Sequence, residues 1–92
     1  MKFSRAFKVM LTQEGLTQKK LAADAGYKTV SAISTPLAKE DIMLSTLTRL
    51  AKAAGYSVCL VKDGASAEEY PPIRIDPKEY PKAVHEPILK EE

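Results

Sequence analysis

Three glycines divide the first part of this sequence into short segments with a helical pattern. Before Gly15, Gly26 and Gly55, apolar residues recur at intervals of three and four, which places them on one face of a helix. Glycine ends helices readily because it adopts the left-handed backbone conformation at little cost. No apolar run approaches the roughly 20 residues that a membrane span needs. The sequence therefore predicts a small bundle of short helices that does not cross a membrane.

Ser and Thr residues predict where three of these helices begin. A side-chain oxygen at the N-cap accepts a hydrogen bond from a free backbone N–H of the first turn. Ser4 is expected to cap a first helix over residues 4–14. Thr17 is expected to cap a second helix, and Ser45 a last helix that runs to Gly55.

The third helix contains a proline. It is expected to start at Thr29. Its buried residues are expected to be Val30, Ile33 and Leu37. Pro36 has no backbone N–H, and its ring clashes with the preceding turn. We therefore predict that the helix ends or kinks near Thr35 and that residues 38–43 form a polar connector.

After the last helix the pattern changes to that of a strand. Residues 56–62 are rich in β-forming side chains and end at a turn signal, Asp63-Gly64. A single strand needs a partner, which either a later segment such as Ile73-Arg74-Ile75 or another subunit would supply. Residues 63–92 hold five of the six prolines and are typical of a polar, extended tail. We therefore divide the chain into a domain over residues 1–62 and a tail over residues 63–92.

The chain offers few groups for catalysis. It has one cysteine, Cys59, and one histidine, His85, so a disulfide framework, a Cys/His zinc site and a Cys–His nucleophile pair are not expected. The first residues carry charge and lack the apolar run of a secretory signal. We therefore expect a cytoplasmic binding protein that is not an enzyme and needs no cofactor or metal.

The net charge of +2 conceals two halves of opposite sign. Residues 1–52 carry nine basic and four acidic groups, whereas residues 53–92 carry five basic and eight acidic ones. The basic first half indicates an anionic partner, and nucleic acid fits if the charges gather on one face.

The second and third helices, joined at a glycine, have the pattern of a helix pair that reads DNA. The residues that carry this pattern are Leu16-Thr17-Gln18, Leu21-Ala22, Gly26 and Ile33-Ser34, followed by Leu44-Ser45-Thr46-Leu47, Leu50-Ala51 and Ala54-Gly55. In these residues the chain resembles the Xre/Cro family of helix-turn-helix repressors, over about residues 3–61. The resemblance implies a mainly α, compact four- or five-helix, lambda-repressor-like domain, followed here by a C-terminal β-strand and an extended tail. It also implies a transcriptional regulator that binds operator DNA as a dimer.

Ten residues are predicted to meet the DNA. By position, the resemblance places Gln18, Lys28, Thr29, Ser31, Ala32, Ser34 and Thr35 there. Lys19, Lys20 and Lys39 are added as lysines that would contact phosphates. The exposed face of the third helix lacks Arg, Asn and Gln, the side chains that make two hydrogen bonds to one base. Its hydroxyls make single hydrogen bonds, and Ala32 offers a contact to a thymine methyl. Affinity is therefore expected to come mainly from lysines on phosphates, with specificity from paired half-sites and DNA shape.

The predicted strand is also the predicted dimer contact. In several members of the family a strand after the last helix pairs across a two-fold axis, and residues 56–62 occupy the matching place. Tyr56, Val58 and Leu60 would then lie in the contact between two copies. This arrangement would place two recognition helices about 34 Å apart, one turn of DNA.

Two other functions remain open. The resemblance extends to antitoxins of the host-inhibition type, which repress their own operon and also inhibit a toxin. In that case the acidic, aromatic tail would cover a basic toxin surface, through Glu68, Glu69, Tyr70, Glu79 and Tyr80. More generally, the tail offers Tyr70, Ile73, Ile75 and Tyr80 as a docking arm for a partner. The third possibility is a helix-turn-helix domain that has lost DNA binding and keeps only dimerisation.

Overall fold

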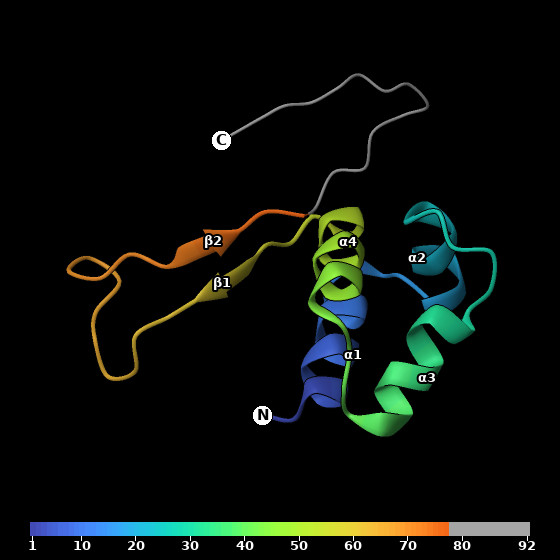
Figure 1. Cartoon of the computed structure of the whole chain (residues 1–92), viewed down its shortest axis with the longest axis horizontal. Coiled ribbons are helices and arrows are strands. Elements are labelled where there is room, and N and C mark those ends of the chain that lie inside the picture. Colours follow the sequence, from blue (N-terminus) through green and yellow to red (C-terminus); the bar gives the residue numbers. More distant parts are fainter. Residues whose placement is uncertain (78–92) are drawn as a thin grey trace, which may run out of the picture.

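The chain is mainly helical, with a short two-stranded sheet after the last helix. The structure is a computed structural model that describes residues 1–77. In chain order its elements are α1 (Phe3–Glu14), α2 (Gln18–Asp24), α3 (Ser31–Lys39), α4 (Leu44–Ala54), β1 (Val58–Leu60) and β2 (Ile73–Ile75). In Figure 1, α1 and α4 stand together in the centre, α2 and α3 lie on one side of them, and the strands project on the other. Across residues 1–77, each helix is too short or too polar to span a bilayer.

One apolar core holds the four helices together. Its most deeply buried large side chains are Leu21, Ile33 and Leu50, from α2, α3 and α4. Helix α1 adds Phe7, Met10 and Leu11 from its inward face. The faces that the apolar repeats predicted for α1, α2 and α4 are therefore confirmed, and the opposite faces are free for solvent or a partner.

The three predicted N-caps differ in outcome. Thr17 caps α2 as predicted, because its Oγ1 accepts a hydrogen bond from the Lys20 N–H at 3.1 Å. The prediction for Ser45 is wrong, since α4 begins one residue earlier with Met43 at its N-cap. The prediction for Ser4 is also wrong, since Lys2 is the N-cap of α1.

Ser4 instead binds a carboxylate that is distant in sequence. Its backbone N–H donates to Glu40 Oε1 at 3.0 Å, and its hydroxyl donates to Glu40 Oε2. The Glu40 carboxylate thus accepts a hydrogen bond from the Ser4 N–H in the first turn of α1, which is the role of an N-cap side chain. These hydrogen bonds, with that of the hydroxyl the stronger influence, hold the pKa of the Glu40 carboxyl below its ordinary value. Glu40 therefore links the end of α3 to the start of α1.

Helix α3 departs from its prediction at both ends. It begins at Ser31, later than Thr29, and Val30 is 40% exposed where a buried residue was expected. It also continues through Pro36 to Lys39, although an end or kink near Thr35 was predicted. The buried side chains of Ile33 and Leu37 hold the helix on both sides of the proline. Two hydrogen bonds then close its last turn, from the Glu40 N–H to the Leu37 carbonyl and from the Asp41 N–H to the Pro36 carbonyl.

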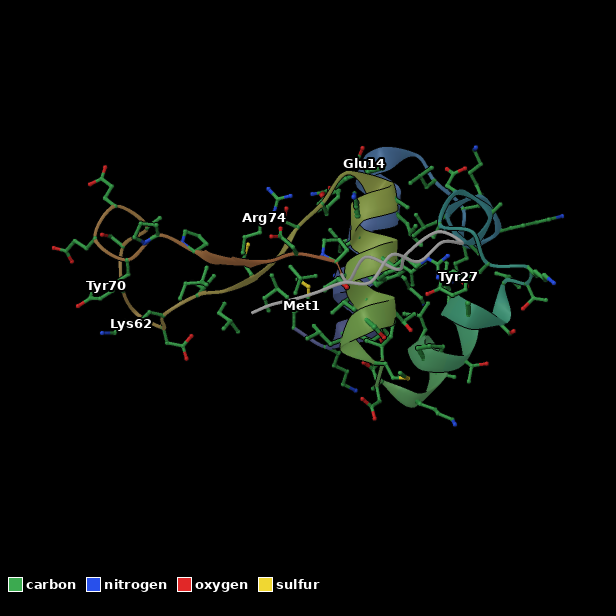
Figure 2. The ribbon with its side chains drawn as sticks, turned by 45° about the horizontal axis from the view of Figure 1, so that its top comes forward. Met1, Glu14, Tyr27, Lys62, Tyr70 and Arg74 are labelled. Atoms are coloured by element: carbon green, nitrogen blue, oxygen red, sulfur yellow. The ribbon has the colours of Figure 1, made fainter. Side chains whose placement is uncertain are left out.

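The two strands form an antiparallel hairpin within the chain. The strand predicted over residues 56–62 is shorter, Val58–Leu60, and Ile73–Ile75 is its partner, one of the two partners that the sequence left open. Val58 pairs with Ile75, and Leu60 pairs with Ile73. The hairpin therefore contains residues from both sides of the predicted boundary between the domain and the tail, at residues 62 and 63. The side chains of these two residue pairs form one apolar face of the hairpin. At its far end, Lys62 Nζ lies 4.0 Å from the centre of the Tyr70 ring (Figure 2).

Candidate nucleic-acid interface

The helix pair α2 and α3 is placed on one side of the molecule by its buried residues. Leu21 and Ala22 anchor α2, and Ile33 and Leu37 anchor α3. The polar side chains of both helices consequently face outwards. The turn between the helices, residues 25–30, is longer than the tight turn that the sequence suggested.

Arg49 of α4 fixes the start of this turn. Its Nε donates a hydrogen bond of 2.8 Å to the carbonyl oxygen of Ala25. Its guanidinium carbon lies 4.7 Å from the centre of the Tyr27 ring, a cation–π contact between α4 and the turn before α3. Gly26 has φ of 89°, and a Cβ there would lie 2.9 Å from Arg49 Nη2. The arginine therefore requires glycine at this position, and it sets the position of the chain entering α3.

An open groove of about 700 Å³ runs along the exposed face of α3. Three segments line it, namely the turn before α3, α3 itself, and the segment from residue 41 to the first turn of α4. The lining residues are Tyr27, Lys28, Thr29, Ser31, Ala32, Thr35, Pro36, Lys39, Asp41, Ile42, Met43 and Thr46. The groove thus lies on the side of the molecule that the sequence predicted for DNA.

Six of the ten predicted DNA-binding residues line this groove. They are Lys28, Thr29, Ser31, Ala32, Thr35 and Lys39. The other four, Gln18, Lys19, Lys20 and Ser34, do not line it, although all of them are at least partly exposed. The groove therefore contains only part of the predicted DNA-binding residues. None of its lining residues belongs to α2.

Two of the predicted side chains already have partners within the chain. Lys20 Nζ lies 2.9 Å from Asp24 Oδ1, an exposed ion pair one helical turn apart. The hydroxyls of Thr29 and Ser31 lie 2.6 Å apart and share one hydrogen bond. An exposed pair of this kind contributes little stability, so Lys20 can exchange Asp24 for a phosphate at little cost.

The site predicted from the sequence lacks six residues of the groove and one that supports it. The groove residues are Tyr27, Pro36, Asp41, Ile42, Met43 and Thr46, and the supporting residue is Arg49. Asp41, Ile42, Met43 and Thr46 were assigned to a connector and a helix start, and Arg49 was counted only as one basic charge. No local pattern marks these roles, because each depends on where α4 lies against α3.

The three residues predicted for the dimer contact differ in their surroundings. The Tyr56 hydroxyl donates to Gln13 Oε1 at 2.7 Å and lies 3.1 Å from Glu14 Oε2, so it is held by α1. Partial desolvation and the Glu14 carboxylate raise the pKa of this hydroxyl. Val58 is half-buried, whereas Leu60 is 60% exposed on the same face of the hairpin. Tyr80 of the predicted docking tail lies outside the described residues, as does His85, the single histidine.

Compared with protein-family models, curated proteins and solved structures, the chain has no significant match. Among the described residues, no group of three or more His, Cys, Asp or Glu side chains is placed to hold a metal ion. The site is therefore interpreted from its own geometry.

Proposed function

We propose that this chain is a DNA-binding transcriptional regulator, a repressor that acts as a dimer. The observation that carries the proposal is the outward face of α3, which is framed by Lys28 before the helix and Lys39 in its last turn. A helix presented in this way fits a DNA major groove, which is about 12 Å wide. The excess of basic over acidic groups in residues 1–52 adds attraction to the phosphates.

The hairpin supports the dimer part of the proposal. Leu60 and Ile73 lie opposite each other in the two strands and are 60% and 65% exposed. An isolated two-stranded hairpin is only marginally stable in water, so covering this face in a second copy would stabilise it. The dimer would then involve both strands of each copy.

A mobility-shift assay on the DNA upstream of the protein's own gene tests this function. The full chain is expected to shift this DNA selectively, with an affinity that falls as salt rises. Lys28→Ala removes one phosphate contact from each copy and so two from the dimer, and the slope of log K against log salt for the dimer should become shallower by about 1.8.

Lys52→Ala is the matched control for this assay. Lys52 is an exposed lysine in the last turn of α4 and does not line the groove. The two variants lose the same charge, so only the position differs. Equal slopes for the two variants would place the DNA elsewhere, and no shift by the full chain would remove the proposal.

The hairpin also favours a second candidate, a toxin-binding antitoxin. Its exposed apolar residues Leu60, Val61, Ile73 and Tyr70 project away from the helices, and Glu68 and Glu69 are exposed in its loop. Such a surface suits a basic protein partner with apolar pockets. Purification with the product of the neighbouring gene tests this candidate, since a plain repressor would elute alone.

A further inference from the structure

The groove along α3 has a composition unlike that of a surface that reads bases by paired hydrogen bonds. Its lining contains no Arg, Asn or Gln. It does contain Ala32, Pro36, Ile42 and Met43, and three threonines, whose side chains each carry a methyl group. Of the four bases, only thymine presents an apolar group, its C5-methyl, at the edge of the major groove. Between the two lysines that frame α3, the apolar lining therefore matches thymine.

Met43 is the most exposed of these apolar side chains. It is 72% exposed, at the N-cap of α4, where the backbone is extended with φ of −68° and ψ of 142°. Along extended backbone, neighbouring side chains point to opposite sides. Ile42 packs against the core, so Met43 is held outwards, on the wall of the groove that faces α3.

The charged groups of the groove specify how a DNA edge would lie in it. Lys28 and Lys39 lie just before α3 and at its end, and a helix of this length spans about 13.5 Å, comparable with the width of the major groove. They can therefore reach the phosphates on either side. Asp41, also in the groove, repels phosphate, and its carboxylate is able to accept a hydrogen bond from the amino group of a cytosine. Base edges, and not the phosphate backbone, consequently fit between α3 and the segment from Asp41 to the start of α4.

We propose that this groove recognises thymine methyl groups and that Met43, which lies outside the α2–α3 pair, is a specificity-determining residue. This inference rests on the proposed function, because it names the chemical feature of DNA that the same surface reads. Specificity then arises from apolar contacts shared between α3 and the segment before α4. Asp41 adds a preference for cytosine beside the thymines.

The test compares thymine with uracil, which pairs identically and lacks only the methyl group. Duplexes that bind the full chain are first selected from a random pool. Affinity is then measured for the best duplex and for versions in which single thymines are replaced by deoxyuridine. Each methyl that lies in the groove should weaken binding about four-fold when removed, the value for one buried methyl group.

Variants assign the effect to the groove wall. Met43→Ala should lose part of this sensitivity to uracil, because the side chain that covers the methyl is gone. Leu44→Ala is the matched control, since Leu44 is the next residue, is 54% exposed and does not line the groove. It should keep the full thymine preference. Circular dichroism of both variants checks that the helices are intact.

The outcomes separate this inference from the proposed function. Selective, salt-sensitive binding that is indifferent to uracil at every position would overturn the thymine inference and leave the DNA-binding function standing. An equal loss of uracil sensitivity in Met43→Ala and Leu44→Ala would overturn the role of Met43. Failure to enrich any duplex from the pool would overturn the function and the inference together.

Discussion

The helical part of the molecule and the hairpin use apolar residues in opposite ways. In the helices, Leu21, Ile33 and Leu50 are at most 1% exposed. In the hairpin, Leu60 and Ile73 are 60% and 65% exposed, although they lie directly opposite each other. The helices therefore obtain their stability from their own core, whereas the hairpin leaves apolar area uncovered. Among the described residues, these apolar side chains of the helices are therefore covered within the chain, and those of the hairpin are the ones that the proposed dimer would cover.

The largest expected effect is a contrast in stability between these two parts. Leu50→Ala leaves a cavity in the core and should lower the free energy of unfolding by about 2–5 kcal/mol. Ile73→Ala removes a side chain that is mostly in solvent in a single copy, so at protein concentrations where the chain is monomeric the loss should stay within about 0.5 kcal/mol. Urea denaturation at low protein concentration, followed by circular dichroism, measures both. Losses of similar size in the monomer would mean that the hairpin face is covered within the chain, contrary to the comparison.

An intermediate effect is expected where Arg49 contacts the turn before α3. Gly26→Ala places a Cβ at positive φ, which costs about 1–2 kcal/mol, and also against the guanidinium. Gly55→Ala has nearly the same φ, 88°, and an open space around its Cβ, so it reports the backbone cost alone. Gly26→Ala should therefore be the more destabilising of the two in thermal or urea unfolding.

A double mutant completes this measurement. In the background Arg49→Met the guanidinium is absent, so Gly26→Ala and Gly55→Ala should become equally destabilising. If the difference persists without Arg49, another contact is responsible for the requirement for glycine at position 26.

The smallest effect concerns pH and the link between Glu40 and Ser4. The folded pKa of Glu40 lies below its unfolded value of 4.5, so the carboxylate stabilises the fold above that value and loses this contribution as pH falls through the lowered folded pKa. Glu40→Gln should thus be less stable than the parent chain near neutral pH. The two proteins should become alike only once the pH has fallen below the lowered folded pKa of Glu40, because the parent carboxyl is then protonated. Urea midpoints across this range measure the effect, and a gap that stays constant with pH would exclude the carboxylate as its source.

Local signals predicted the helical part well, and contacts between distant residues account for the errors. Thr17 caps α2 as expected, since an N-cap needs only its own first turn. Ser4 does not cap α1, because Glu40 supplies the acceptor from 36 residues away. Pro36 does not end α3, because the buried side chains around it hold the helix. In each error a tertiary contact overrides a local preference.

The candidate site was predicted in its centre and missed at its edges. The exposed residues of α3, such as Ala32 and Thr35, follow from helical periodicity together with the resemblance. Met43 and Arg49 could not be found in that way, because their roles depend on how α4 packs against α3. The partner of β1 was left open between two choices, since a strand pattern defines a need for pairing and does not identify the partner.

Arg49 binds the main chain of Ala25 and not a side chain. A carbonyl oxygen is present whatever amino acid occupies the position, so this anchor tolerates replacement of the side chains around it. The residue type does matter at Gly26, where a Cβ would lie against the guanidinium, and at Tyr27, whose ring contacts it. The outward residues of α3 can therefore be replaced, in evolution or by design, without loss of the hydrogen bond that positions the start of the turn before the helix.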